Sequence, residues 1–472
     1  MDGDRVDKVL QDVLKEITPS EQEKQQTSAI LDKVKSATNE ILKPFGFSHL
    51  VAGSFIRDTW MRDKKEFDVF ILFPKNRSRE KLEKDGLEIG KNIAKKLRGK
   101  HRIAFAEHPY VRANIDGYEI DIVPCYKVDS ALRIKSAVDR TPFHNEWLSR
   151  HLFPKFIPEV RLFKQFCKGQ GLYGSDTKTL GFSGYLCELL TINYRNFRTL
   201  AEAAAKWEPG KVLINLEGFS GFDDIDYLHK KFPKQPLIVV DPVDPGRNVA
   251  AAVSPENFMK FVFACREFLK KPSRDFFFRK PFQVDPEKLE REMLNKKSKF
   301  IGFSFKAPDV IPDILWPQLR RTGKRIRDML EDHDFGVMNW DVWTNDLDKC
   351  IIFFELESWS LPKHRKLIGP SIFSKRHTGE FIEKYKDKGR IWIENEFWVA
   401  EIRRTFQEVR PKLKEILTED EKTLKAKGIA SYLAKEITKK FDILQERELI
   451  SHARRYPEFG ELLTNFFEKR VV

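Results

Sequence analysis

Residues 53–74 read GSFIRDTWMRDKKEFDVFILFP, and this stretch decides the fold of the first part of the chain. It opens with a Gly-Ser pair and closes with a run in which acidic and apolar residues alternate up to a proline. Side chains two residues apart on a β-strand point to the same face, so Glu66 and Asp68 present two carboxylates on one side. The residues that alternate with them are apolar, and we expect that face to meet a hydrophobic core.

A third carboxylate stands on a later predicted strand. Asp121 lies between Ile120 and Ile122 with the same alternation. Three carboxylates on neighbouring strands repel one another and lose hydration, a cost that cations relieve. Oxygen ligands at this density favour Mg²⁺, which also takes substrate phosphates as ligands. The sequence therefore predicts that Glu66, Asp68 and Asp121 bind two Mg²⁺ ions beside a phosphorylated substrate.

Two metal ions at such a site divide the chemistry of phosphoryl transfer. One would lower the pKa of an RNA 3′-hydroxyl that attacks the α-phosphate of a nucleotide, and the other would steady the triphosphate and the departing pyrophosphate. Upstream, Gly53 lets the backbone approach the phosphates, and Ser54 supplies a hydroxyl and an amide. We expect residues 55–60 to form a short helix whose amino terminus attracts the triphosphate together with Arg57.

The surrounding sequence predicts a mixed α/β unit that ends near residue 150. We expect its first helix to open with a capping box at Thr18-Pro19-Ser20-Glu21, and a second helix over about residues 78–97. An Asp-Gly turn joins the last two strands. The predicted strands are residues 48–51, 66–73, 102–106, 111–115 and 119–123.

The rest of the chain predicts further units, so the fold class is α+β with several domains. Residues 157–269 have mainly helical periodicity. Beyond residue 284, strands at 300–305, near 342 and at 351–356, with a helix over 318–330, resemble a small RNA-recognition-type sandwich. The remainder is a basic, mostly helical tail with a short aromatic strand at 391–393.

Composition narrows the classes of partner and compartment. The chain has 472 residues, a formal net charge of +14 and five cysteines without a C-x-x-C pair. The positive charge predicts a polyanionic partner. The odd cysteine set argues against a disulfide framework or a zinc site. The first residues lack an apolar signal core, and the apolar runs are only strand-sized, so we expect a cytoplasmic protein without a membrane contact.

Two basic stretches are candidate RNA-binding surfaces. Residues 361–390 hold nine Lys and Arg against three acids, and residues 266–280 mix cations with Phe268 and the phenylalanines of 276–278. Basic groups pair with phosphates while exposed aromatic rings stack on bases. The alternative is a solvated helix face followed by core phenylalanines. The cations of the second stretch are Arg266, Lys270, Lys271, Arg274, Arg279 and Lys280.

A Gly-Ser pair, a Glu-x-Asp pair twelve residues after the serine and a third strand aspartate together resemble the catalytic unit of the polymerase-beta-type nucleotidyltransferase superfamily. That superfamily uses many substrates, so the triad alone does not identify one. Longer stretches are similar to the archaeal-type CCA-adding enzymes, over nearly the whole chain and more loosely beyond residue 254. They are residues 53–74, EHPYVRANIDGYEIDIVPCYKV (107–128), SAVDRTPFHNEWL (136–148), EVRLFKQFCKGQGLYG (159–174), GFSGYLCELL (181–190) and VVDPVDPGRNVAAAVS (239–254).

This resemblance implies a magnesium-dependent enzyme that adds and repairs the 3′-terminal CCA of tRNA without a template. Its substrates would be CTP, ATP and tRNA that lacks all or part of the CCA, with pyrophosphate released. The resemblance is also compatible with a homodimer. The implied domains are a polymerase-beta-like catalytic head (1–150), a helical nucleotide-binding neck (151–270), an α/β body (271–360) and a basic tail for tRNA binding (361–472).

The resemblance also implies roles for individual residues. Glu66, Asp68 and Asp121 match the metal ligands. Arg247, in DPVDPGRNVA, matches an arginine that reads the edge of the base, a role that suits a planar donor fork. The positions that match nucleotide contacts are Ser54, Arg57, Thr141, His144, Lys164, Tyr173 and Arg247.

Taken alone, four of these residues have a structural alternative. Lys164 lies on an apolar helical stripe, where a triphosphate could be its anionic partner, or it could snorkel from the edge of the stripe. His144 could be an ordinary structural histidine. Tyr173 could cap a core, and Arg247 could pin a loop.

Three other functions stay in view. A poly(A)- or oligoadenylate-synthesising nucleotidyltransferase shares the triad but uses ATP alone. A small-molecule adenylyltransferase fits poorly with the long basic carboxy-terminal half, and a non-catalytic RNA-binding protein fits poorly with three intact carboxylates. If the tail binds tRNA, charge reversal at Lys363, Arg365 and Lys366 should raise the KM for tRNA.

Overall fold

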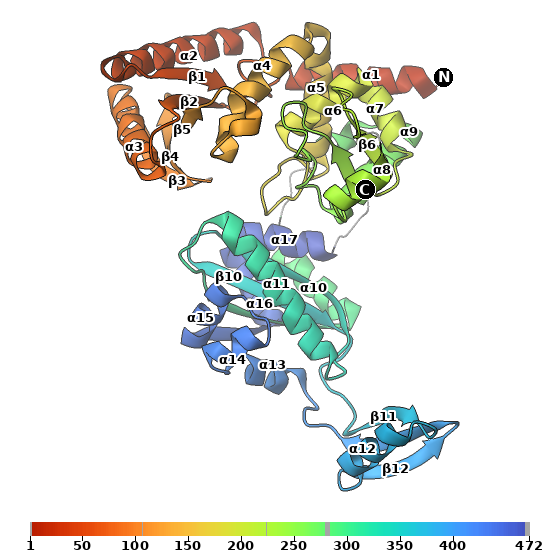
Figure 1. The fold of residues 1–472 in the computed structure, drawn as a ribbon. Coiled ribbons are helices and arrows are strands. Elements are labelled where there is room, and N and C mark those ends of the chain that lie inside the picture. The colour runs from red at the N-terminus through yellow and green to blue at the C-terminus, as the bar shows by residue number, and fades with distance from the viewer. Residues whose placement is uncertain (1, 106, 223, 279–283, 468–472) are drawn as a thin grey trace. The chain divides into compact units, whose positions relative to one another are not determined.

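A computed structural model describes residues 2–105, 107–222, 224–278 and 284–467 of the chain (Figure 1). The chain divides near residue 281 into two compact units. The first unit holds a five-stranded sheet and a helical region, and the second holds a four-stranded and a three-stranded sheet. Among the helices of the described ranges, none is both long and apolar enough to cross a bilayer.

The five-stranded sheet contains the strand within residues 53–74 that carries Glu66 and Asp68. The strand of residues 66–74 pairs in parallel with that of 118–127 and antiparallel with that of 48–52, and the strand of 109–115 pairs antiparallel with those of 118–127 and 100–105. All five predicted strands are confirmed, with ends that differ by up to four residues. In sheet order they are β1 (Ser48–Ala52), β2 (Glu66–Pro74), β5 (Tyr118–Lys127), β4 (Pro109–Ile115) and β3 (Lys100–Phe105).

Two helices, α2 (Glu21–Leu42) and α3 (Arg79–Lys96), cover one face of this sheet. The apolar alternate residues of β2, such as Val69, are buried in the core beneath them. Because neighbouring side chains on a strand point in opposite directions, Glu66 and Asp68 belong to the other face. The sheet therefore presents its carboxylates away from α2 and α3.

The start of α2 differs from the prediction by two residues. The N-cap is Ser20, and Ser20 and Glu23 form the capping box. A further helix, α1 (Asp2–Ile17), precedes it and leaves Thr18 and Pro19 as the link between the two helices. The apolar stripe of α1 is buried in the core of the helical region, which fixes this helix in place.

The helical region of the first unit has one aromatic-rich core. Phe268 and the phenylalanines at 276 and 277 are buried in it, so their core reading is confirmed and their base-stacking reading is wrong. Arg279 and Lys280 lie outside the described residues. The helices are α4 (Thr141–His151), α5 (Ile157–Gly169), α6 (Gly184–Tyr194), α7 (Phe197–Ala204), α8 (Ile225–Lys231) and α9 (Pro255–Lys270), with a two-stranded parallel sheet of β6 (Val212–Ile214) and β7 (Leu237–Val239).

The four-stranded sheet of the second unit is covered on both faces. One core lies under α11 (Pro312–Glu331), α13 (Val409–Leu417), α14 (Glu421–Ala426) and α15 (Ser431–Lys439), and the other under α10 (Pro286–Lys296), α16 (Glu446–Arg455) and α17 (Pro457–Phe467). The sheet therefore offers no open face on which bases could stack, unlike an RNA-recognition domain. Its strands in order are β14 (Phe441–Gln445), β8 (Lys299–Lys306), β10 (Lys349–Leu356) and β9 (Val337–Thr344).

The first part of the expected basic tail, residues 361–408, contains more β-strand than predicted. The order β11 (His364–Ser371), β13 (Phe397–Arg403), β12 (Gly389–Glu394) forms an antiparallel sheet beside α12 (Lys375–Tyr385). The expected strand at 391–393 lies inside β12. Residues 409–467 then pack against the four-stranded sheet again. The α/β body therefore does not end at the expected boundary near residue 360; the three-stranded sheet and α12 are inserted into it.

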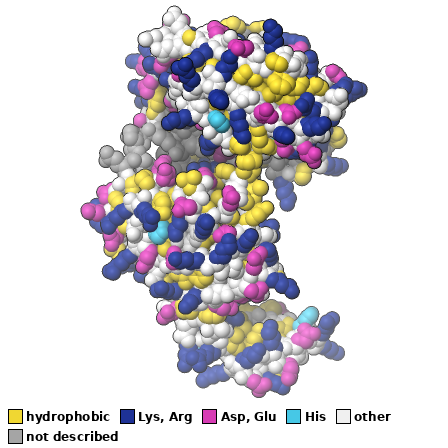
Figure 2. Space-filling model, turned by 90° about the vertical axis from the view of Figure 1, so that its left-hand side faces the viewer, with side chains coloured by type: hydrophobic (Ala, Val, Ile, Leu, Met, Phe, Trp, Pro, Cys, Tyr) yellow, Lys and Arg dark blue, Asp and Glu magenta, His cyan; other side chains and the backbone are white. Residues whose placement is uncertain are grey.

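Charge is spread widely over the surface. Figure 2 shows Lys and Arg side chains over the whole face that it draws, with Asp and Glu between them. Net charge alone therefore does not mark one binding surface, and individual cations have to be selected by their exposure and partners.

The five cysteines are all buried, and none of them forms a disulfide bond.

Candidate nucleotide and metal site

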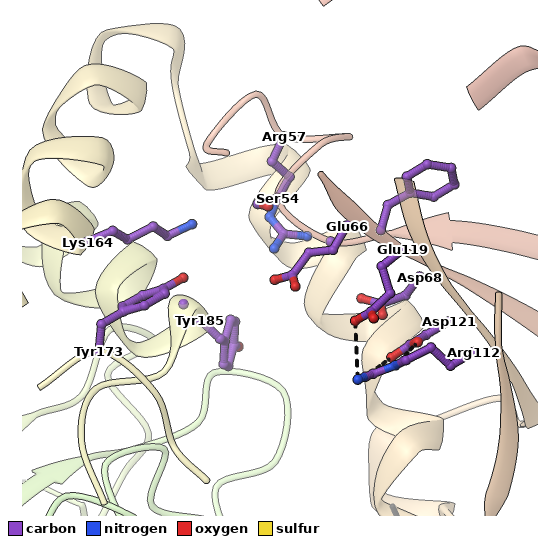
Figure 3. A pocket seen from close by; sticks show the side chains of 13 residues that line it. Ser54, Arg57, Glu66, Asp68, Arg112, Glu119, Asp121, Lys164, Tyr173 and Tyr185 are labelled. Carbon is purple, nitrogen blue, oxygen red and sulfur yellow. Dashed lines mark hydrogen bonds and ion pairs between the residues drawn. The ribbon is translucent and has the colours of Figure 1, made fainter. Parts of the chain in front are cut away.

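Seven of the ten predicted site residues line one pocket of about 240 Å³ in the first unit. Strands β2, β4 and β5 form one wall, and helices α5 and α6 contribute to the opposite wall (Figure 3). The predicted residues in its lining are Ser54, Arg57, Glu66, Asp68, Asp121, Lys164 and Tyr173. The pocket thus sets carboxylates on the sheet opposite a lysine and a tyrosine on the helical side.

Asp68 is the carboxylate with the least compensation. It lies directly opposite Asp121 in the parallel register of β2 and β5. Within the described residues, no side chain donates a hydrogen bond to Asp68. Burial, followed by the charges of Asp121 and Glu66, raises the pKa of Asp68 to about 7. An acid with so high a pKa marks a place where positive charge is missing.

The other two carboxylates have cationic partners. Arg112 on β4 binds Asp121 through two hydrogen bonds of 2.7 Å, and Lys64 forms an ion pair with Glu66. The hydrogen bonds to Asp121 raise the pKa of Arg112 above its usual range. Throughout the described ranges, no three acidic, histidine or cysteine side chains stand close enough to hold one metal ion. The structure brings Glu66, Asp68 and Asp121 to one pocket without gathering them around one point.

The loop after β1 approaches Asp68 closely. Gly53 has a φ of 101°, and a Cβ at this position would stand 3.3 Å from a carboxylate oxygen of Asp68. The expectation of a short helix over residues 55–60 is wrong, because the segment forms turns. Asp58 has a positive φ, and the rings of Phe55 and Trp60 stack at 4.6 Å, which folds the segment back on itself. Consequently the loop contributes side chains and amides but no helix dipole.

The remaining three predicted residues line a second pocket of about 850 Å³. Thr141 and His144 come from α4, and Arg247 comes from the loop after β7. Tyr185, at the start of α6, lines both pockets. The ten predicted residues therefore fall into two neighbouring pockets, one with the carboxylates and one with Arg247.

A buried aspartate that the sequence reading misses organises the second pocket. Asp241 has no exposed surface; its carboxylate accepts hydrogen bonds from Arg247 (2.8 Å) and Tyr185 (3.4 Å) and lies 2.9 Å from Nε2 of His144. Burial favours the neutral acid, but hydrogen bonds from His144 and Arg247 hold the pKa of Asp241 below its usual range. The Arg247 side chain is 38% exposed, and its ion pair with the buried Asp241 fixes its orientation in the pocket.

A second missed acid lies behind the first pocket. Glu188 on α6 has no exposed surface and contacts Arg57, Thr59 and Lys164. Its signal in the sequence is a lone charge inside the apolar run GYLCELLTI. Such a residue needs a buried partner, but the sequence alone does not say which cation supplies it.

Three sequence families match consecutive parts of the chain. They are described as "Nucleotidyltransferase domain" over residues 31–144, "tRNA nucleotidyltransferase, second domain" over residues 158–278, and "CCA-adding enzyme, C-terminal domain" over residues 296–446. Together they span both compact units.

Individual proteins are similar over most of their length. The CCA-adding enzyme of Methanocaldococcus jannaschii is 40% identical over 82% of this chain and 85% of its own. The CCA-adding enzyme of Methanosarcina acetivorans is 37% identical over 93% of each. Among solved structures, the Cid1 poly(U) polymerase aligns with a TM-score of 0.45 and 15% identity, over 58% of this chain and 98% of that chain.

Proposed function

This chain belongs to the family of archaeal CCA-adding enzymes, and from that membership we propose that it rebuilds the 3′-terminal CCA of tRNA. Nucleotides from CTP and ATP are joined to the RNA 3′-hydroxyl, and pyrophosphate is released. The observation that carries the proposal is one pocket lined by Glu66, Asp68 and Asp121 together with Arg57 and Lys164. Acids for divalent ions beside cations for a triphosphate are the two parts that nucleotidyl transfer needs.

We propose that Glu66, Asp68 and Asp121 hold two Mg²⁺ ions. Dependence on a divalent metal is general in the nucleotidyltransferase superfamily, and the ion and its number are our addition. The donor set contains only oxygen, and Asp68 is a half-buried acid without a described partner, which fits a hard cation. Bound ions supply charge neutralisation at the triphosphate and a lower pKa at the attacking hydroxyl.

Arg112 has to release Asp121 before that carboxylate can serve an ion. Its guanidinium also lies 3.2 Å from Glu119 and donates to the Tyr110 hydroxyl at 2.9 Å, so it keeps partners after the release. Arg112 therefore acts as a built-in counterion to Asp121 in the ion-free protein.

We propose that the second pocket takes the nucleoside. Arg247 offers a planar set of donors suited to acceptors on a base edge, and Asp241 fixes its orientation. His144 packs on the Tyr185 ring with centroids 4.2 Å apart, which gives that pocket a flat aromatic side. Tyr185 connects the nucleoside to the triphosphate pocket.

An addition assay with each nucleotide alone and in combination tests the proposal. With tRNA that ends at the discriminator base, CTP alone should add two residues, and CTP with ATP should add C, C and A and then stop. ATP alone should add nothing to that RNA. Unlimited addition of A would instead identify a poly(A)-synthesising enzyme.

We also propose that the β11–β13 sheet and α12 bind tRNA through exposed cations. Of the three residues singled out by sequence, Arg365 and Lys366 form ion pairs with Asp334 and Glu394, so they are poor probes. Lys363, Lys375 and Arg390 are exposed and have no ion pair within the described residues.

The variant K363E/K375E/R390E is therefore expected to raise the KM for tRNA about tenfold at moderate salt, with little change in kcat, because phosphate contacts are lost. The effect should shrink as salt rises. A matched control is K81E/K84E/K91E, which makes the same charge change on α3, over the sheet face opposite the pocket. A lower kcat at unchanged KM would contradict the assignment of this surface.

The proposal places the enzyme in the cytoplasm. Its support is kinship with archaeal CCA-adding enzymes, together with five cysteines that are unpaired.

A further inference from the structure

Glu188 joins two segments that the sequence keeps far apart. It lies on α6, and its partners lie in the loop between β1 and β2 and on α5. The carboxylate accepts hydrogen bonds from Thr59 Oγ1 (2.6 Å), Arg57 Nε (3.2 Å) and Lys164 Nζ (3.3 Å), and its second oxygen lies 3.1 Å from Nη2 of Arg57. We call Glu188, Arg57, Thr59 and Lys164 the Glu188 cluster.

The two cations of the cluster also line the pocket of the carboxylates. Lys164 is 2% exposed, and its three N–H groups are all engaged, by Thr59 O (3.2 Å), Thr59 Oγ1 (3.0 Å) and Glu188. Arg57 is held from its other side by Asn145 at 3.2 Å. Figure 3 shows both side chains directed toward the space beside Glu66.

The cluster carries one more positive than negative charge. A pair that served only to fix the fold would need one cation for one buried anion, because each unpaired buried charge is costly. The extra cation faces a pocket where an anion can compensate it. A phosphate oxygen that reaches Lys164 must replace an existing acceptor, and the neutral oxygens of Thr59 yield more easily than the carboxylate.

Burial and charge act in opposite directions on Lys164. Burial lowers the pKa of its ammonium group, the Glu188 carboxylate raises it, and the nearby Arg57 lowers it again. Glu188 itself is kept ionised: burial opposes its charge, but Lys164 and Arg57 hold its pKa below the usual range. The other groups that face Lys164 are Cys187 on α6 and Tyr173, and Glu66 lines the pocket from β2.

We propose that Glu188 is a positioning residue for the incoming nucleotide, which holds the side chains of Arg57 and Lys164 directed at the triphosphate before it arrives. This inference rests on the proposed function and adds a residue that does not itself touch the reacting atoms. It separates the recognition of the triphosphate, common to CTP and ATP, from the recognition of the base.

The test is calorimetric binding of CTP and of ATP with Mg²⁺ in the absence of RNA, followed by steady-state addition to tRNA. Glu188→Gln is expected to raise the Kd and KM of both nucleotides by about tenfold to a hundredfold, the effect of losing a hydrogen bond to a charged group. The value of kcat at saturating nucleotide should fall much less, because the lost contact serves binding.

The pH profile separates positioning from a merely structural role. Without the carboxylate, which raises the pKa of Lys164, this lysine should lose its proton at lower pH, so nucleotide binding by E188Q should begin to weaken at a lower pH than wild-type binding does. Glu188→Asp, which keeps the charge, should recover most of the affinity. Asp58→Asn is the matched control: it removes a carboxylate from the same loop, one that pairs with Arg161 on α5 and lines neither pocket.

A double substitution covers the case in which E188Q unfolds. Lys164→Met with Glu188→Gln removes both charges of the pair, which leaves no uncompensated ion in the core. On the K164M background, the further change at Glu188 should weaken nucleotide binding much less than it does alone. Fully additive effects would overturn the inference, and so would E188Q that binds both nucleotides as tightly as wild type does and with the same pH profile. If the wild-type chain adds no CCA in the same assay, the proposed function fails instead.

Discussion

Replacement of Asp68 by Asn is expected to reduce nucleotide incorporation by at least about a thousandfold, because the pocket loses the carboxylate at its centre. Asp68 faces Asp121 across the β2–β5 pair and lies beside Gly53. Binding of tRNA should change by less than about twofold, since it depends on phosphate contacts elsewhere. Single-turnover addition and filter binding of tRNA measure the two quantities.

The same substitution is expected to stabilise the ion-free protein. Folding raises the pKa of Asp68 from its usual 3.8 to about 7, so its charge costs stability once pH exceeds the lower value, and the cost is complete above the higher one. In EDTA at about pH 8, the Tm of D68N should exceed that of wild type by a few degrees, and the gap should close toward about pH 4. Added Mg²⁺ should raise the Tm of wild type only.

Asp116→Asn is the control for both measurements. Asp116 occupies the β4–β5 turn with a positive φ that Asn also tolerates, and it pairs with Lys33 outside the pocket. It removes the same charge from the same sheet. Normal activity of D68N, or an equal loss in D116N, would refute the assignment of Asp68 as a metal ligand.

Replacement of Arg247 by Ala is expected to lower kcat/KM for CTP by about a hundredfold or more and to weaken discrimination against UTP. A site built to hydrogen-bond a base edge loses selectivity when its donors are removed. Arg247 lines the second pocket and is fixed by Asp241, so Asp241→Asn should show a smaller loss in the same direction. Competition between CTP and UTP for one tRNA measures the selectivity.

Arg198→Ala is the matched control for Arg247. Arg198 forms ion pairs with Asp7 and Glu202 on the surface and lines neither pocket. It should retain both activity and selectivity. If R247A discriminates between CTP and UTP as wild type does, Arg247 only pins its loop, which is the structural alternative open from the sequence.

Local patterns in the sequence were sufficient for the parts of the site that lie on strands. Alternation along β2 and β5 places Glu66, Asp68 and Asp121 on one face, and the register of the two strands brings Asp68 and Asp121 side by side. That geometry needs only the period of a strand. The segment after Gly53 also points to Arg57, whereas the family resemblance was needed to single out Lys164 and Arg247, which no local period would distinguish from structural residues.

The residues that hold these groups depend on long-range packing. Glu188 and Arg57 are 131 positions apart, and His144 and Asp241 are 97 apart. Arg112 could have been found only from the register of β4 on β5, where it faces Asp121. A sequence pattern can show that a lone charge such as Glu188 needs a partner, but the partner is chosen by the tertiary fold.

Errors at the ends of elements have similar causes. Thr18 and Ser20 are both good N-cap residues, and the choice between them depends on where α1 ends. In the basic segment, charged residues conceal the alternation of β11 and β13. The phenylalanines near residue 276 fit an exposed stacking surface and a buried core equally well until the core that receives them is known.

The return of residues 409–467 to the four-stranded sheet has a consequence for synthesis on the ribosome. Strand β14 and helices α13 to α17 complete both cores around β8 and β10, yet they are translated after the three-stranded sheet. The three-stranded sheet is therefore fully synthesised first, whereas the four-stranded sheet must wait for the last part of the chain before its two cores can be completed. A premature stop after Arg403 would therefore leave β8 and β10 without β14 and helices α13 to α17. We expect the exposed apolar surface of such a chain to be recognised by chaperones or proteases.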